Sequence, residues 1–239
     1  ANRFFLSDAL VSGNIEHLTD EIVRIKEEEG LDVLAITDKY GYVVLRASNL
    51  ENLGDNQGAD DELVHAVLLG EKHIESTVIV QRDDLLNESP QLAEQAYFEY
   101  IDTPLARQRE ETEETAGMML KAVAPVFDSQ DNLIGTVYGG VLLNRNHDIV
   151  DKVKQTVYQD VVYKGQDIGT ATIFQDDLRI TTNVKNNDGS RALGTRVSEE
   201  VYNQVVLEGE PWIGRAYVVN NWYTTAYEPI TDVYDRIIG

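Results

Sequence analysis

The 239-residue chain contains no cysteine, and this absence excludes two ways of stabilising a fold. Neither disulfide bridges nor metal sites with thiolate ligands are available, so we expect the folded chain to rely on apolar packing. Basic residues are also scarce, because 20 lysines and arginines stand against 42 acidic residues and give a net charge of -22. A field of this sign repels phosphate backbones and anionic headgroups, which makes nucleic acid an unfavourable partner.

Motifs for catalysis, cofactor binding and membrane insertion are missing as well. The chain has neither a phosphate-binding nor a dinucleotide-binding glycine motif, and no apolar run approaches the ~18 residues of a transmembrane helix. No histidine stands near a nucleophile motif or near enough further ligands for zinc: His17, His65, His73 and His147. We therefore predict a protein that is not an enzyme and carries no metal or cofactor. A hydrolase that uses two of the many acidic residues is the alternative, and it requires carboxylates about 5 to 9.5 Å apart in a cleft.

The main positive feature of the sequence is an internal repeat. Residues 229–239, PITDVYDRIIG, repeat residues 125–135, PVFDSQDNLIG, in register. The identical pairs are Pro125 and Pro229, Asp128 and Asp232, Asp131 and Asp235, Ile134 and Ile238, and Gly135 and Gly239. An apolar strand, a polar turn that contains the aspartates and a second apolar strand predict a β-hairpin in each copy. A repeat of this kind indicates two copies of one module.

A second repeat sets the predicted domain boundaries. Residues 67–74 and 206–213 share an apolar pattern followed by Gly-Glu, but their separation is larger, so the first copy contains an insertion at about 82–117. We predict a long N-terminal helix at 1–30, a first module at 31–146, a connecting helix at 147–166 and a second module at 167–239. Because an apolar strand follows Gly135 and nothing follows Gly239, the second module lacks its final strand, and we expect the natural chain to continue.

The predicted fold class is α+β, with each module built as a mostly antiparallel sheet with flanking helices and loops. In the N-terminal helix, Phe4, Val11, Leu18 and Ile25 recur every seven residues and form a narrow apolar stripe. This stripe is suited to a partner helix and suggests a homodimer. Packing against the helix's own chain is the alternative.

Polar and aromatic residues that suit a ligand site are confined to the second copy. Arg196 precedes a helix for which Ser198 is the predicted N-cap, and an arginine there is suited to binding a carboxylate bidentately. The predicted ligand-binding residues are Arg196, Arg215, Tyr217, Trp222, Tyr223, Thr225 and Tyr227. Alternating strand residues place Tyr223, Thr225 and Tyr227 on one face of the sheet and Trp222 on the other. The alternative is that these are ordinary sheet residues with exposed arginines.

Three motifs of the second copy make it resemble the Cache sensor domains of bacterial transmembrane receptors: RITTNV, DGSRALGTRV and GRAYVVNNWYTTAYEPI. The whole chain resembles the fused double-Cache type, type 3 with type 2. The resemblance implies a PAS-like extracytoplasmic sensor that lies between two membrane spans and binds a small carboxylate or an amino acid, often in its membrane-distal module.

The same resemblance implies which kind of signalling protein the sensing domain belongs to. Receptors of this type are most often methyl-accepting chemotaxis proteins, so we expect a periplasmic or extracellular sensing domain of a chemoreceptor in the inner membrane. Two alternatives stay open. One is the sensor domain of a histidine kinase, and the other is a structural or dimerising ectodomain without a ligand.

Overall fold

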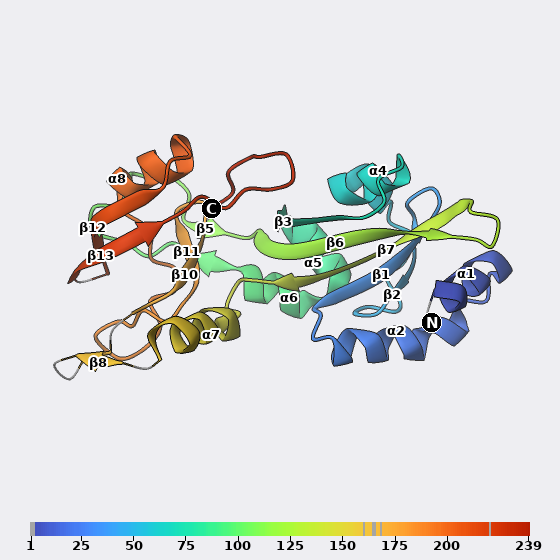
Figure 1. Ribbon diagram of the computed structural model, residues 1–239, viewed down its shortest axis with the longest axis horizontal. Helices are drawn as coiled ribbons and strands as arrows, with labels where there is room; N and C mark the ends of the chain where they lie inside the picture. Colours follow the sequence, from blue (N-terminus) through green and yellow to red (C-terminus); the bar gives the residue numbers. More distant parts are fainter. Residues whose placement is uncertain (1–2, 160, 164–165, 168, 220) are drawn as a thin grey trace. The chain divides into compact units, whose positions relative to one another are not determined.

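The computed structural model describes residues 3–159, 161–163, 166–167, 169–219 and 221–239, and its elements are labelled in Figure 1. The chain divides into two compact units, each with its own apolar clusters. Unit 1 comprises residues 1–78, 83–92 and 119–142. Unit 2 comprises residues 79–82, 93–118 and 143–239. The predicted α+β class is confirmed in its coarse form, a mixed fold with a mainly antiparallel sheet.

Unit 1 is built on a five-stranded sheet with the order β2-β1-β7-β6-β3. The pairings of β1 with β2, of β1 with β7 and of β6 with β7 are antiparallel. The strands are β1 (Val33–Asp38), β2 (Val43–Arg46), β3 (Ile74–Val80), β6 (Gly117–Phe127) and β7 (Leu133–Leu142). Side chains of consecutive residues point to opposite faces, so helices are needed on both sides of this sheet.

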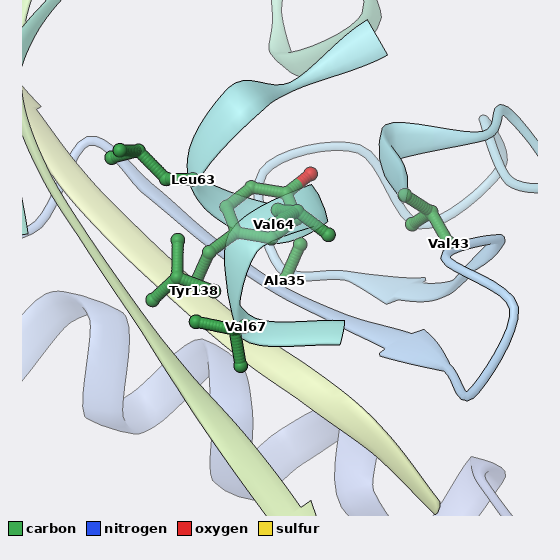
Figure 2. Packing of buried hydrophobic residues seen from close by; sticks show 7 residues of the cluster. Ala35, Val43, Leu63, Val64, Val67 and Tyr138 are labelled. Atoms are coloured by element: carbon green, nitrogen blue, oxygen red, sulfur yellow. The ribbon is translucent and has the colours of Figure 1, made fainter. Parts of the chain in front are cut away.

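Helix α4 (Glu62–Leu68), which follows the short helix α3 (Gln57–Asp60), packs on one face of the sheet through Leu63, Val64 and Val67. These side chains meet Ala35, Val43 and Tyr138 from the strands, as Figure 2 shows. The carboxylate of Asp61 caps α4, because its Oδ1 accepts hydrogen bonds of 2.9 Å from two backbone N–H groups of the first turn.

The predicted N-terminal helix at 1–30 is instead two helices, α1 (Arg3–Ser12) and α2 (Glu16–Glu28). The break falls at Gly13, whose φ of 70° is left-handed and ends a right-handed helix. Leu18 is fully buried against the strand face of unit 1, whereas Val11 is 66% exposed. The described part of the apolar stripe therefore packs partly on its own sheet. The Phe4 side chain lies outside the described residues.

The two repeated turns have the same backbone geometry. In the first, Asp128 N–H donates to Asn132 O over 3.0 Å and Asp131 N–H donates to Asp128 O over 3.2 Å. The second repeats the first of these bonds between Asp232 and Arg236, also at 3.0 Å. The fourth residue of the turn has a left-handed φ, 61° at Asp131 in one copy and 59° at Asp235 in the other. The predicted role of these aspartates as turn-forming residues is confirmed.

Unit 2 contains two antiparallel hairpins, β10 with β11 and β12 with β13. Residues near the C-terminus connect them, because Asp176 N–H donates to Ile238 O at 2.9 Å and Ile230 N–H donates to Gly239 O at 2.8 Å. The main strands and helices of this part are β10 (Thr172–Gln175), β11 (Leu178–Thr182), α8 (Glu199–Tyr202), the π-helical turn η1 (Asn203–Leu207), β12 (Trp212–Val218) and β13 (Asn221–Tyr227).

Two predicted boundaries differ from the structure. The connecting helix α7 (His147–Tyr158) ends well before residue 166, at Gln159, which has a left-handed φ of 49°. The predicted insertion of the first module is divided, and residues 93–118 fold with unit 2. The remaining short elements are α5 (Arg82–Glu88), α6 (Pro90–Ala96), β4 (Phe98–Glu99), β5 (Glu113–Glu114), β8 (Val162–Tyr163) and β9 (Gln166–Asp167).

A charged network is buried inside unit 1. The fully buried Arg46 side chain pairs with Glu88 Oε1 at 2.9 Å and with Asp55 Oδ2 at 2.8 Å. Glu88 also accepts hydrogen bonds from the hydroxyls of Tyr138, at 3.0 Å, and Ser48, at 2.5 Å. The two carboxylates share one guanidinium, and pairing together with hydrogen bonds is the condition under which buried ions are tolerated.

We predict that Glu88→Ala lowers the free energy of unfolding by about 3 to 5 kcal/mol, because it leaves the Arg46 guanidinium buried beside fewer partners. Urea denaturation measures this change. Glu28→Ala is the matched control, since Glu28 pairs with Arg24 on the exposed surface of α2 and its loss should have a much smaller effect. Equal losses in the two variants would contradict the prediction.

We expect the free energy of unfolding to depend on pH through His147, at the start of α7. Burial lowers the pKa of His147, and the positive charge of Arg191 lowers it further. The unfolded chain therefore takes up a proton at a higher pH than the folded chain, so stability is lost as the pH falls below about 6.5. We predict that wild type loses more stability than His147→Gln between about pH 7.5 and about pH 5 in urea denaturation. Identical losses in the two proteins would show that His147 does not contribute to the pH dependence of stability.

Candidate functional site

Unit 2 contains a small, partly open cavity of about 120 Å³. The wall combines valines and rings with polar groups, among them the carboxylates of Asp176 and Glu228. The cavity is lined by Thr172, Phe174 and Asp176 at β10, by Val197, Val201, Val205 and Val206 on the covering segment, and by Ala226, Tyr227, Glu228, Ile230 and Gly239 at the C-terminal end of the chain.

The covering segment, residues 197–206, consists of an extended start, α8 and the π-helical turn η1. Val197, Val201 and Val205 recur every four residues, so one helical face packs toward Phe174 and Tyr227. The predicted N-cap bond of Ser198 is absent among the described contacts of α8. The N–H of Glu199 instead donates to the carbonyl oxygen of Leu105 at 2.8 Å.

A deeply buried charge lies near the cavity. It is that of Arg179 on β11, which is 2% exposed. Its Nε donates to Thr195 Oγ1 at 3.0 Å, and its Nη1 donates to the cavity residue Thr172, at Oγ1, over 3.1 Å. The guanidinium carbon lies 4.9 Å from the ring centre of Phe174, a second cavity residue. Arg179 is therefore held directly behind the cavity wall, at the position opposite Phe174 in the hairpin.

No carboxylate of the described residues pairs with Arg179, and none of them accepts a hydrogen bond from its Nη2. Burial without a counter-ion lowers the pKa of Arg179 to about 10, so the group keeps its positive charge at neutral pH. Burial also raises the pKa of the neighbouring Tyr227 hydroxyl, which stays neutral and able to donate. The region behind the wall thus has an uncompensated positive charge.

Three of the predicted residues, Tyr223, Thr225 and Tyr227, lie on the inner face of β13, as the alternation of strand residues required. They stand opposite Ala216, Gly214 and Trp212 of β12, respectively. Tyr227 lines the cavity, and its ring centre lies 5.9 Å from that of Phe174. Thr225 donates its hydroxyl to the Gly214 carbonyl at 3.2 Å, and Tyr223 is 40% exposed.

Three other predicted residues, Arg215, Tyr217 and Trp222, lie on the opposite face of the same hairpin. Tyr217 and Trp222 pair edge to face with ring centres 5.6 Å apart, and the Arg215 guanidinium lies 5.5 Å from the Trp222 ring. Trp222 is 55% exposed. The structure therefore does not bring the seven predicted residues together around one cavity.

The remaining predicted residue, Arg196, belongs to an ionic cluster beside the cavity. Its Nη1 lies 3.2 Å from Asp177 Oδ2, and its Nη2 donates to the carbonyl oxygen of Arg107 at 2.9 Å. Arg107 and Arg109 also pair with the Asp176 and Asp177 carboxylates, over 2.8 to 3.2 Å. Arg196 is thus paired with a carboxylate, unlike Arg179, although its buried Nε has no partner among the described residues.

These contacts explain why part of the predicted insertion folds with unit 2. Residues 101–109, here called the strap, run beside the segment that precedes α8. Ile101 N–H donates to Gly194 O at 2.9 Å, and Arg196 N–H donates to Thr103 Oγ1 at 3.0 Å. Because Asp176 both lines the cavity and accepts bonds from Arg107 and Arg109, the strap is linked directly to the cavity wall.

A second hollow, a groove of about 640 Å³ between α7 and the loop at 183–191, is larger but more open. Its best anion-binding group, Arg191, forms a two-point pair with Asp151 at 2.9 and 2.6 Å. The described residues also contain no group of three or more histidines and acids placed to hold a metal ion. The small cavity is therefore the better candidate site.

Arg179 was missed in the sequence, although a signal was present. It is a single arginine between Leu178 and Ile180 in a short strand, where both neighbours are fully buried. A charged residue in such a strand is either paired or functional, and no sequence pattern indicates which.

Residues 141–239 match the family model described as Single cache domain 3. Every residue that lines the cavity lies within this range, and so does Arg179. No curated protein matches the chain. Among the described residues, no helix is both long and apolar enough to cross a membrane.

Several solved structures are similar to the chain at low identity. A domain of a sensory box/GGDEF family protein from Vibrio parahaemolyticus has 12% identity and a TM-score of 0.44, with 93% of this chain and 83% of that chain covered. The extracellular domain of the histidine kinase vpHK1S-Z8 has 12% identity and a TM-score of 0.43, with 95% of this chain and 74% of that chain covered. The periplasmic domain of Vibrio cholerae LuxQ has 11% identity and a TM-score of 0.40, with 92% and 80% covered.

We predict that replacing both strap arginines, Arg107→Gln with Arg109→Gln, increases amide hydrogen exchange in residues 101–109 about tenfold, because the strap loses its ion pairs with Asp176 and Asp177. Mass spectrometry of the exchanged protein measures this rate. Arg82→Gln, an exposed arginine outside the strap, is the control and should leave the rate unchanged. Unchanged exchange in the double variant would show that the ion pairs do not hold the strap.

Proposed function

We propose that the chain is the extracytoplasmic sensing part of a transmembrane signalling receptor and that unit 2 binds a small carboxylate or amino acid. The observation that carries this proposal is the buried, uncompensated guanidinium of Arg179 behind the wall of the small cavity. A guanidinium binds a carboxylate through two parallel hydrogen bonds, and the Nη2 of Arg179 has a donor for this purpose.

The energetics favour a functional role for Arg179 over a structural one. A charge buried without a counter-ion costs free energy, whereas a structural ion in a core is normally matched, as Arg46 is in unit 1. A ligand carboxylate would offset the cost of burying Arg179. Thr172 and Tyr227 line the cavity beside it and supply hydroxyl groups, so Tyr227 remains a predicted ligand-binding residue.

The family match of residues 141–239 supports a sensor domain of the Cache type for this part of the chain. We extend the proposal to a double-Cache arrangement because the repeated turns have the same hydrogen bonds in both units. In this arrangement unit 1 has a supporting role, and the parent protein is anchored in the inner membrane with the chain on its periplasmic or extracellular side.

The proposed mechanism is a shift between two conformations rather than catalysis. A ligand that binds Arg179 and the covering segment together favours the closed arrangement of α8 and η1 over β10. The backbone bond from Asp176 to Ile238 then connects the cavity wall to the last residues of the chain. The proposed output is that of a methyl-accepting chemotaxis receptor. A histidine kinase is the alternative, since the proposed binding step would be the same for either output. A dimerising ectodomain without a ligand is the third candidate.

The test is titration calorimetry of the chain with short carboxylates and amino acids. We predict that Arg179→Met reduces affinity at least about 100-fold, because the carboxylate loses a two-point charged contact. The melting temperature of the unliganded variant should stay the same or rise, since a buried charge without a counter-ion is removed.

Arg215→Gln is the matched control. Arg215 lies on the outer face of β12, away from the cavity, so this variant should bind like wild type. Full affinity in Arg179→Met would overturn the proposed site. A lowered melting temperature with unchanged binding would assign Arg179 a structural role only.

A further inference from the structure

The two units differ in the middle of their sheets. In unit 1, β7 lies between β1 and β6 and pairs antiparallel with both. In unit 2, β10 pairs with β11 and β12 pairs with β13, but among the described residues the two pairs form separate sheets. One edge of β10 and one edge of β13 therefore pair with no described strand. Strand edges of this kind are templates for a further strand.

The strands of the two units correspond in order, with β1, β2, β3 and β6 matching β10, β11, β12 and β13. The register of β1 shifts between Ile36 and Thr37, and that of β10 shifts at the same place, between Ile173 and Phe174. Both β6 and β13 lead toward the repeated aspartate turn. The open edges of β10 and β13 thus correspond to the two edges that β7 pairs with in unit 1.

Gly239 occupies the same place in unit 2 as Gly135, near the start of β7, occupies in unit 1. A side chain on Gly135 would collide with the carbonyl oxygen of Thr37 on β1, and one on Gly239 would collide with that of Phe174 on β10. On its other side, Gly239 O accepts a hydrogen bond from Ile230 N at 2.8 Å. The backbone at Gly239 is therefore already seated between the two hairpins.

The small cavity lies directly ahead of Gly239. Its wall contains Thr172 and Phe174 from β10, Ala226 and Tyr227 from β13, and Gly239 itself. We call the space between these two strands the strand gap. Since β7 continues from Gly135 between β1 and β6, a strand that continues from Gly239 in the same way would run through the strand gap.

The surroundings of the strand gap indicate which side chains fit there. In unit 1, Tyr138 of β7 packs with α4 on one face, and Val137 packs in the cluster on the other face. In unit 2, Val201 and Val205 cover one face of β10, and Ile173 packs in a second apolar cluster on the opposite face. A strand that is buried on both faces is apolar on both faces, so an apolar segment fits this gap.

We infer that the strand gap accepts one extended apolar strand, which enters next to Gly239 and pairs antiparallel with both β10 and β13. The occupant is the stretch that follows Gly239 in the parent protein, and with it unit 2 has a five-stranded sheet in the same order as unit 1. This inference goes beyond the proposed function and does not depend on the ligand.

The first experiment extends the chain after Gly239 with a copy of residues 136–143, TVYGGVLL. Amide hydrogen exchange in residues 171–176 and 221–228 should become about tenfold slower or more, because both strand edges gain hydrogen-bond partners. The matched control is the same extension with proline at its second and sixth positions. Proline has no N–H and is not tolerated in a central strand, so this control should exchange like the unextended chain.

The second experiment tests the register with a disulfide, since the chain has no cysteine of its own. Ala35 stands opposite Tyr138 in unit 1, and Thr172 corresponds to Ala35, because each lies two residues before the matching Thr37 or Phe174. Opposite residues have Cβ atoms about 4.5 to 5.5 Å apart. Thr172→Cys, combined with a cysteine at the third position of the extension, should therefore form an intramolecular disulfide that mass spectrometry detects after digestion.

Ile213→Cys with the same extension is the matched control. Ile213 is 85% exposed on β12, so this pair should form no intramolecular disulfide. A disulfide-linked dimer in place of the intramolecular bond would assign the strand gap to a second copy of the chain. Unchanged exchange together with no disulfide would show that the gap takes no strand. Either result overturns the inference.

Calorimetry of the extended chain with carboxylates and amino acids separates this inference from the proposed function. If the two strand edges are protected but no acid binds, the inference stands and the proposed function is wrong. If an acid binds while the edges stay unprotected, the proposed function stands and the inference is wrong.

Discussion

The organisation of unit 2 depends on how a single buried guanidinium is held. Arg179 is fixed by threonine hydroxyls and by the ring of Phe174, and no described carboxylate neutralises it. Hydroxyl groups orient an arginine without matching its charge, so the charge stays available to an anion in the cavity. The covering segment, with its valines every four residues, keeps water away from this charge and so strengthens its interaction with a ligand.

In unit 1, by contrast, a buried arginine is neutralised by acidic residues. Arg46 is buried as deeply, but Glu88 and Asp55 neutralise it, and Tyr138 and Ser48 complete the hydrogen bonds of Glu88. The buried arginine of the first unit thus has internal carboxylate partners, and that of the second lies beside a small cavity. Acidic residues therefore neutralise the buried arginine of one unit, whereas the buried arginine of the other lies beside a candidate ligand site.

Much of the fold was predictable because it depends on local sequence. The aspartate turns at 128 and 232 form wherever the carboxylate can accept from the following backbone N–H groups, and both hairpins of the second copy follow from strand alternation. The single N-terminal helix was predicted wrongly, because the heptad stripe outweighed Gly13, whose left-handed backbone divides the helix. For the site, alternation separated Tyr227 from Trp222 correctly but did not indicate which face was enclosed.

The sequence by itself determined the repeat, the turns, the strand periodicity and the location of the polar and aromatic residues in the second half. These are short-range properties, set by backbone conformation and by side-chain alternation within a few residues. Only the tertiary structure decided that Arg196 is paired with Asp177 through the cluster at the strap, that residues 93–118 belong to unit 2 and that Arg179 has no acidic partner among the described residues. Each of these depends on residues far apart in the chain, and charge compensation is a property of three-dimensional neighbours that no local pattern records.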